Sequence, residues 1–348
     1  MIDTTWPALI QNSRAIDANE PGSTCPRIYP LTDTCIVEVS GDGAEKLLQG
    51  QLTCDVRTLN DQQGAFGAIC TPQGRMFSLF RIVRSEGVFL LKMSQSTVEP
   101  FLQRIEKYRQ FFKADIQVKS DKVCFGLHIP DASYANNDSL NAWINTLPKG
   151  ANHQRTQQNT TVFRLPTLAN YWEIWTDKNS WINDSSGLPL RELLTDTQPQ
   201  AELTETNEWN IQLALGGIPE LAEKSVDQLV PHMVNLHKIG GVSFKKGCYT
   251  GQEIVARMEY LGKLKKQVYC YQASHERCLG AETTIHDQEG ANLGSFISSF
   301  KNQLGVAGLA LLPKSLEDNF ENNTYQLESV IDGESISLAL SLPRYLSV

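Results

Sequence analysis

The chain has 348 residues, of which 41% are hydrophobic and 20% are charged, and its formal net charge is −8. This length allows two or three domains with their own cores, and the composition is typical of a globular protein. The negative charge argues against a protein that coats nucleic acid, although it leaves room for a local basic patch. No apolar run is long enough to span a bilayer, so we expect no membrane association.

Residues 1–130 predict a mixture of strands and helices. Residues 1–30 indicate a short helix and a loop. Strands are expected at 34–39, 65–70, 76–83, 88–93, 116–119 and 123–128, and helices at 44–48 and 98–112. Asp42 is the expected N-cap of the first helix, and Ser96 begins an S-x-x-E capping box before the second. Antiparallel neighbours around a helix favour an α+β fold over a doubly wound sheet.

The remaining elements divide at about residue 262. Before it, the pattern predicts helices at 140–147, 178–195 and 205–215, strands at 161–165 and 171–176, and a polar loop at 152–160. After it, short strands are expected at 267–273, 283–286, 293–298, 305–311, 324–331 and 335–340. Six short strands in about 80 residues indicate a small all-β barrel. We therefore predict one region over 1–262 and a second over 263–348.

The cysteines and the N-terminus indicate the cell compartment. None of the eight cysteines belongs to a C-x-x-C pair, so no metal site is expected. The opening MIDTTWPALIQNSRAIDANE lacks the basic and apolar regions of a secretion signal. These features predict a cytoplasmic protein with free thiols.

Residues 240–261, GGVSFKKGCYTGQEIVARMEYL, combine a glycine-rich loop with the start of a helix. Thr250 or Gly251 is the expected N-cap. The apolar positions with helical spacing are Ile254, Val255, Met258 and Leu261. Cys248 would then lie before a helix N-terminus, where the helix dipole, Lys245 and Lys246 would favour the thiolate. The alternative is a buried cysteine in a structural turn.

The segment KGCYTGQE, preceded by GG-V-S-F-K and followed by I-V-A-R-M, resembles the signature of the YgfZ family. Residues 48–56 (LQGQLTCDV), 217–219 (GIP), 229–231 (LVP) and 235–236 (NL) also fit the family pattern. These folate-binding proteins are built like the T-protein, the aminomethyltransferase of the glycine cleavage system. The resemblance implies an α+β body of two interleaved ferredoxin-like units and a C-terminal β-barrel.

The resemblance also implies a function. The protein would bind tetrahydrofolate in a central cavity and support the assembly or repair of iron–sulfur enzymes, including those that methylthiolate tRNA. Its implied partners are folate and an iron–sulfur enzyme. Apart from the resemblance, the net negative charge and the lack of an RNA-binding module predict no stable nucleic-acid binding, and a monomer is the default expectation. The motif residues are Lys246, Gly247, Cys248, Tyr249, Gly251, Gln252 and Glu253. Cys248 is the candidate catalytic residue, expected at or near the cavity.

Trp209 is the implied folate contact, because a family tryptophan associated with folate lies ten residues before the position of Pro219. An aromatic ring can stack on a pterin, although a core tryptophan is the usual alternative. A second folate-associated tryptophan of the family is replaced here by Thr34.

The reaction class remains open at this stage. A T-protein carries a catalytic carboxylate where this chain has Ser78, and residues 72–85 contain no Asp or Glu. Classical aminomethyltransferase activity is therefore not expected, although a tetrahydrofolate-dependent one-carbon transferase is the alternative. A third hypothesis is an adaptor that docks an iron–sulfur partner through the basic residues of 245–266.

Two further pairs of side chains, near the segments that carry the family resemblance, are weaker functional candidates. His232 and His237 could hold a metal, but two ordinary histidines are the simpler interpretation. Asp55 and Arg57 could face the cavity, or they could form a surface ion pair.

Overall fold

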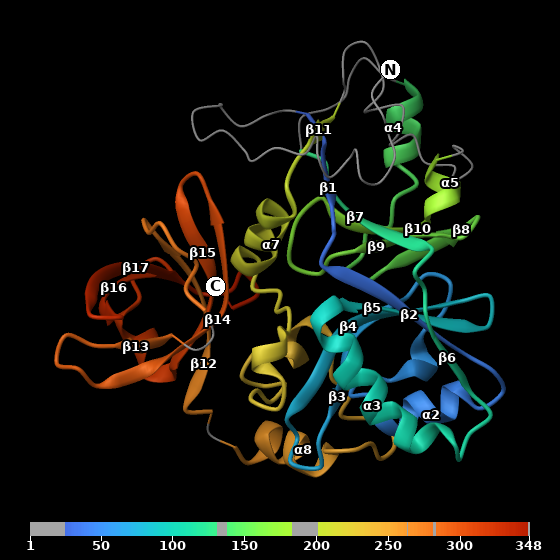
Figure 1. Cartoon of the computed structure of the whole chain (residues 1–348), viewed down its shortest axis with the longest axis horizontal. Coiled ribbons are helices and arrows are strands. Elements are labelled where there is room, and N and C mark those ends of the chain that lie inside the picture. Colours follow the sequence, from blue (N-terminus) through green and yellow to red (C-terminus); the bar gives the residue numbers. More distant parts are fainter. Residues whose placement is uncertain (1–24, 131–137, 183–200, 263, 281–282, 347–348) are drawn as a thin grey trace.

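The computed structural model describes residues 25–130, 138–182, 201–262, 264–280 and 283–346 (Figure 1). Two sheets form the body of the molecule, and a barrel lies beside them. The first sheet has the order β11-β1-β7-β10-β9-β8. Its strands are β1 (Arg27–Pro30), β7 (Lys122–His128), β8 (Gln154–Gln157), β9 (Thr160–Arg164), β10 (Tyr171–Asp177) and β11 (Glu202–Leu203).

The second sheet is antiparallel throughout and has the order β3-β4-β5-β2-β6. Its strands are β2 (Thr34–Ser40), β3 (Ala65–Cys70), β4 (Met76–Ser85), β5 (Val88–Ser94) and β6 (Asp115–Val118). The chain places β1 in the first sheet, builds the whole second sheet, and then returns to the first at β7. This exchange confirms the predicted α+β body of two interleaved units.

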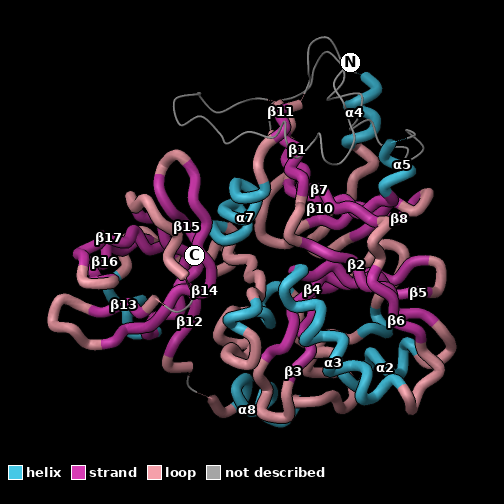
Figure 2. Tube along the Cα trace, viewed as in Figure 1, coloured by secondary structure: helices cyan, strands magenta, loops and turns pink. Residues whose placement is uncertain are grey.

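Helices cover the sheets and connect the parts (Figure 2). The α-helices are α2 (Ala44–Gln51), α3 (Val98–Arg109), α4 (Asp138–Ile144), α5 (Lys178–Ile182), α7 (Thr206–Leu215) and α8 (Gln252–Tyr260). The short 3₁₀ turns are η1 (Val56–Thr58), η2 (Gln95–Thr97), η3 (Glu223–Ser225), η4 (Leu236–Ile239) and η5 (Lys314–Asn319). Leu47 of α2 and Phe101 of α3 share a core with Val37 and Leu91 of the second sheet. These helices therefore cover one face of that sheet.

The predicted C-terminal barrel is confirmed, and it closes in the order β12-β15-β14-β13-β16-β17. Its strands are β12 (Lys266–Ala273), β13 (Thr284–His286), β14 (Asn292–Asn302), β15 (Gly305–Pro313), β16 (Thr324–Ile331) and β17 (Glu334–Ser341). The barrel interior is apolar and includes Tyr269, Phe296 and Leu338. The proposed division at residue 262 remains a prediction.

Helix α7 lies between the body and the barrel (Figure 1). Its residues Trp209, Ile211, Leu213 and Ala214 are all buried, as expected of a helix enclosed on several sides. The backbone carbonyl of Ala214 accepts a hydrogen bond from the Cys270 thiol of β12 at 3.1 Å. After the last strand, the Tyr345 hydroxyl returns to donate to the Gly217 carbonyl. The barrel is therefore packed against the body through α7.

Several local predictions were wrong. The polar loop expected at 152–160 contains β8, whose turn into β9 uses Gln158 and Asn159 at positive φ. Strand β1 was not predicted. Helix α2 begins after Gly43 rather than Asp42, and the capping box at Ser96 does not form, because η2 occupies that turn. The helix expected in 1–30 and most of that at 178–195 lie outside the described residues.

Within the described residues, no helix combines the length and the apolar character needed to cross a bilayer.

Candidate functional site

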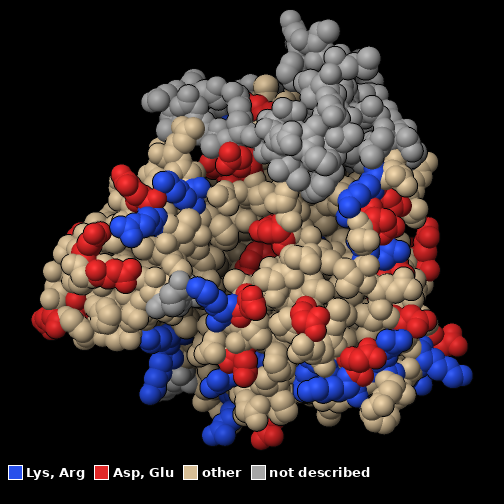
Figure 3. Space-filling model, viewed as in Figure 1, with Lys and Arg blue, Asp and Glu red and all other residues tan. Residues whose placement is uncertain are grey.

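A pocket of about 480 Å³ opens between the body and the barrel. Figure 3 shows a hollow at this junction with acidic side chains inside it. The body contributes Asp33, Ser94, Ser96 and Glu220, and the barrel side contributes Cys278, Leu279 and Ile297. Its size and its mixture of carboxylates, hydroxyls and apolar groups fit a small-molecule site.

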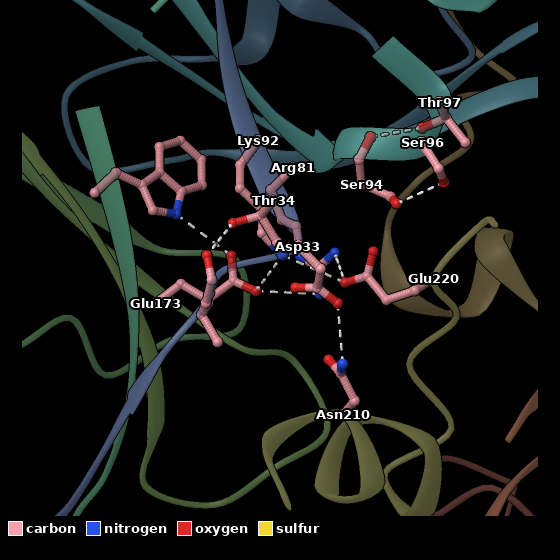
Figure 4. Close-up of polar contacts among 12 residues, drawn as sticks. Asp33, Thr34, Arg81, Lys92, Ser94, Ser96, Thr97, Glu173, Asn210 and Glu220 are labelled. Carbon is pink, nitrogen blue, oxygen red and sulfur yellow. Dashed lines mark hydrogen bonds and ion pairs between the residues drawn. The ribbon is translucent and has the colours of Figure 1, made fainter. Parts of the chain in front are cut away.

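A buried charge network lies behind this pocket (Figure 4). Arg81 of β4 binds Glu173 of β10 at 3.2 Å and also contacts Glu220, while Lys92 of β5 lies 3.3 Å from Glu173 and 3.4 Å from Glu220. The side chains of Arg81 and Glu173 are completely buried. Two cations thus balance two carboxylates, as buried charges require. The network joins the second sheet, the first sheet and the loop after α7.

Glu220 connects the network to the pocket. Its side chain is 19% exposed, whereas Glu173 is enclosed. Burial raises the pKa of the Glu220 carboxyl, but Arg81 and Lys92 outweigh burial and hold this pKa below its ordinary value. The pocket wall therefore carries an ionised carboxylate with a fixed orientation.

Asp33 supplies a second carboxylate, just before β2. The Nδ2 of Asn210, on α7, donates a hydrogen bond to Asp33 Oδ2 at 3.1 Å. Its neighbour Trp209 points the other way, into the core, where its ring lies 5.3 Å from that of Tyr29 and its side chain is 1% exposed. Trp209 does not line the pocket in this conformation, because α7 buries it. Its contact with folate remains a prediction.

Two positions at which this chain departs from a family pattern, one for folate contact and one for catalysis, lie on strands β2 and β4 of the second sheet. Thr34, which replaces a family tryptophan, donates its hydroxyl to the Leu31 carbonyl. Ser78, which stands in the place of a carboxylate, is completely buried and lies 3.1 Å from the Thr97 hydroxyl. Neither side chain is placed to act as an acid or a base.

The cysteine loop, residues 240–251, is docked on the end of α2 and the segment after it. The Thr53 hydroxyl donates to the Gly241 carbonyl at 2.6 Å, and the Ser243 amide donates to the Thr53 carbonyl at 2.9 Å. Further along, the Thr250 amide donates to the Gly50 carbonyl at 3.2 Å. These bonds join the two segments of the chain, 48–56 and 240–251, that carry much of the family resemblance.

Lys246 forms the centre of this docking. Its Nζ donates to the carbonyls of Leu52 at 2.8 Å and Cys54 at 2.7 Å, and it lies 5.1 Å from the ring centroid of Tyr249. The residue is 7% exposed, and burial lowers the pKa of its ammonium to about 8. Lys246 therefore points into the body. This placement does not fit the expectation that it acts on the Cys248 thiol.

Cys248 is exposed at the tip of the loop, so the alternative of a buried cysteine is wrong. Lys245 and Gly247 are exposed beside it, whereas Tyr249 is buried. Cys248 does not line the pocket described above, because the bonds to residues 50–54 hold its loop elsewhere on the body. Its place at or near a folate-binding cavity stays a prediction.

Helix α8 begins at Gln252 with Gly251 as its N-cap, one of the two predicted positions. Gly251 has φ +85°, and a Cβ there would stand 2.4 Å from the Thr71 carbonyl oxygen, so glycine is required. Cys248 lies outside the first turn, where the dipole effect is strongest. Gln252 is half-buried and Glu253 is exposed at the start of the helix.

The apolar stripe predicted for α8 holds for Val255, which is buried, but not for Leu261, which is 82% exposed. The helix ends at Tyr260, and Leu261 has φ −130° and ψ −12°. Because the chain leaves the helix there, the helical period no longer sets the direction of this side chain.

The weaker candidates have structural partners. His232 Nε2 lies 3.2 Å from Glu259 Oε2, and its ring is 4.7 Å from that of His237. Burial lowers the pKa of His237 to about 4, which keeps this imidazole neutral near pH 7. Arg57 pairs with Glu45 on the surface at 3.4 Å.

Sequence reasoning missed the pocket residues Asp33 and Glu220, and it missed Lys92 and Glu173 of the buried network behind the pocket. Each stands alone in its segment, and no short motif joins them. A charged residue within an apolar strand run, such as Lys92 in VFLLKMS, was the available signal, because a buried charge needs a partner.

Known proteins resemble this chain in sequence and in fold. No protein-family model matches it. It is 29% identical to the tRNA-modifying protein YgfZ of Aliivibrio fischeri (strain MJ11), over 100% of this chain and 99% of the relative. It is 30% identical to YgfZ of Colwellia psychrerythraea (strain 34H), over 77% and 80% of the two chains. For YgfZ of Escherichia coli O157:H7 (strain EC4115), the identity is 30% over 76% and 77%.

Among solved structures, the glycine cleavage system aminomethyltransferase T from Bartonella henselae has a similar fold, with a TM-score of 0.70. The alignment covers 97% of this chain and 89% of that one at 15% identity, so the likeness concerns the fold alone. It agrees with the two interleaved sheets and the barrel. Together with the sequence identities, these comparisons show that the chain belongs to the YgfZ family of tRNA-modifying proteins.

Proposed function

We propose that this protein binds tetrahydrofolate in the pocket between body and barrel and supports the assembly or repair of iron–sulfur enzymes that methylthiolate tRNA. Cys248 is the functional residue of its motif. The observation that carries this proposal is the presentation of the cysteine. Its thiol is exposed on a loop held by bonds to residues 50–54, nearly 200 positions earlier in the chain. A fixed, accessible thiol is suited to meeting another molecule.

The pocket residues fit a folate. The aminopyrimidine edge of a pterin donates hydrogen bonds, and the carboxylates of Asp33 and Glu220 would accept them. Leu221 and Ile297 would pack against the aromatic parts, and Lys224 at the rim would attract the glutamate tail. When bound, tetrahydrofolate would supply a carrier for one-carbon units. The residues of this chain would bind and orient it.

Trp209 would contribute to folate binding by positioning α7. Its ring fills the space beside Gly126, where an added Cβ would stand 2.4 Å from the indole. This packing fixes α7, and α7 carries Asn210 to Asp33. Trp209 would thus act on the pocket through its neighbour.

A one-carbon transferase of the T-protein kind is less well supported. Ser78 is buried against Thr97, and the strand that carries it has no carboxylate. The relatives are named tRNA-modifying proteins, which favours the role in tRNA modification.

The experiment that tests the proposal is mass spectrometry of tRNA nucleosides. A strain lacking the corresponding gene would carry the wild type, Cys248→Ala or Cys25→Ala. We expect the wild type and Cys25→Ala to restore the methylthio modification, and Cys248→Ala to leave it at least tenfold lower, because the exposed thiol is lost. Equal rescue by Cys248→Ala would mean that the thiol is dispensable. A wild type that rescues nothing would refute the role in tRNA modification.

Folate binding is tested separately by calorimetric titration with tetrahydrofolate. Glu220→Gln should weaken binding about tenfold to a hundredfold, because it replaces a charge-assisted acceptor with a neutral one. Glu223→Gln is the matched control, since Glu223 lies at the rim of the same pocket and is exposed. If both variants bind as tightly as the wild type, the carboxylate does not recognise the pterin.

A further inference from the structure

The second sheet ends at β6, the strand Asp115–Val118, whose outer side is open. Among the described residues, β6 pairs with β2 alone, and Figure 2 shows it at the margin of the body. At the other end of the sheet, β3 is covered, because the Thr53 amide donates to the Ala68 carbonyl at 3.0 Å and the Ala68 amide donates to the Thr53 hydroxyl at 2.9 Å. The chain itself thus closes one edge of this sheet and leaves the other free.

The backbone groups on the open side belong to Ile116 and Val118. The Lys119 amide donates to the Ile36 carbonyl of β2 at 2.8 Å, and hydrogen-bonded positions alternate along an antiparallel pair. Gln117 therefore also bonds to β2, while the N–H and C=O groups of Ile116 and Val118 point away from it. Among the described residues, these groups form no backbone hydrogen bond outside the ladder. They offer a template for one more strand.

The side chains of the same two residues are apolar and lie at the surface. Val118 is opposite Val37 of β2, which belongs to the core beneath α2 and α3. Ile116 packs partly against the same core, whereas Val118 is 43% exposed. A neighbouring strand with an apolar residue at the facing position would bury this valine.

The charges of the strand stand at its two ends and have opposite signs. Asp115 and Lys119 lie two positions to either side of Gln117, so both point to the face opposite to that of the apolar residues. Asp115 lies 3.7 Å from Arg109, and its side chain is 70% exposed. Lys119 lies 3.9 Å from Glu38. Surface pairs of this kind contribute little, so both groups can gain from a closer partner.

A second copy of β6, placed antiparallel, would match this edge. With a two-fold axis at Gln117, Asp115 of each copy faces Lys119 of the other. Ile116 then faces Val118, and these are the positions whose backbone groups are open to bond across the new pair. Charged residues on an edge strand commonly prevent pairing, but here their order makes the edge complementary to itself.

A different register would lose this match. If the axis lay one position earlier in the chain, Lys119 would face Lys113 of the second copy. If it lay one position later, Asp115 would face Asp121. Like charges directly opposite each other are destabilising. The charges therefore favour the register centred on Gln117.

We propose that two copies of this chain associate through β6, antiparallel about Gln117, and join their five-stranded sheets into one. The occupant of the edge is a second copy rather than a strand of another protein, because the edge complements itself in charge. Strands of four residues make a small contact, so we expect a weak dimer in place of the monomer that is the default from the sequence. Neither the pocket between body and barrel nor the cysteine loop includes a residue of β6, so this association does not depend on the proposed function.

The test is sedimentation equilibrium of the full chain at micromolar to near-millimolar concentrations. The variants are Asp115→Lys and Lys119→Asp, each of which sets like charges opposite each other on both sides of the axis. The matched control is Arg155→Asp, since Arg155 is exposed on β8, the edge strand of the first sheet. Melting temperatures show that each variant is folded.

We expect the wild type and Arg155→Asp to dimerise, and each single β6 variant to dimerise at least about tenfold more weakly, because two facing pairs become repulsive. An equimolar mixture of Asp115→Lys and Lys119→Asp should recover the dimer, since every facing pair then has opposite signs. The double variant Asp115→Lys/Lys119→Asp should recover it for the same reason. A wild type that stays monomeric over this range would overturn the proposal. So would a dimer that both single variants keep, or a mixture that associates no better than its components.

Discussion

Replacing Arg81 with methionine should lower the free energy of unfolding by about 3–5 kcal/mol, because it leaves two carboxylates with one cation in a buried site. Arg81 is completely buried, and it connects Glu173 of one sheet with Glu220 of the pocket wall. Methionine fills much of the volume but carries no charge. Urea unfolding at pH 7 measures the loss.

The neighbouring arginine of the same strand is the control. Arg84 is 38% exposed and pairs with Glu45 on the surface, so Arg84→Met should cost less than about 1 kcal/mol. A cost for Arg81→Met as small as that for Arg84→Met would mean that the buried network does not hold the two sheets together. Arg81→Met should also weaken folate binding, since Glu220 would keep only Lys92 as a cationic partner.

Replacing Lys246 with methionine should cost about 2–4 kcal/mol at pH 7. The change leaves the carbonyls of Leu52 and Cys54 without their donor, and each buried unpaired group costs about 1–3 kcal/mol. Lys245→Met is the matched control, because Lys245 is exposed and should contribute within about 0.5 kcal/mol. Urea unfolding compares the two variants.

The pH dependence distinguishes this role from simple packing. The pKa of Lys246 falls from 10.5 to about 8 on folding, so between these values the unfolded chain binds more protons than the folded one. Stability due to Lys246 should therefore rise as pH rises from 8 to 10.5. The difference in the free energy of unfolding between wild type and Lys246→Met should increase by up to about 3 kcal/mol over this pH range, since one pKa unit corresponds to about 1.4 kcal/mol. If this difference stays constant with pH, the Lys246 ammonium is as well solvated in the folded protein as in the unfolded chain.

The overall fold could be predicted where the sequence carries a strong local period or a specific motif. The six strands of the barrel alternate or run apolar between clear turns, and the family signature implied the body. Strand β1 (RIYP) escaped prediction because a four-residue run next to prolines has no period to detect. Strand β8 (QRTQ) is polar and reads as a loop, although tertiary pairing with β9 makes it a strand.

The site could be predicted only in part, because the direction in which a side chain points depends on the tertiary fold. The sequence placed Cys248 and Lys246 two residues apart, and it could not show that one side chain points outward and the other inward. Lys246 turns inward because the end of α2 supplies two carbonyls that the chain order does not bring near. Likewise, Asp33 and Glu220 meet in one pocket from segments separated by almost the whole body.

The docking of the cysteine loop on residues 50–54 has a consequence for how the protein is made. The contacts of Lys246 with Leu52 and Cys54 span 194 and 192 positions of the chain. Contacts of such high sequence separation form late, since the entropy of closing the intervening chain must first be overcome. A nascent or truncated chain that ends before residue 246 cannot form them. Lys246 and Cys248 are two residues apart, so the thiol is held in its ordered loop only once this late contact with residues 52–54 has formed.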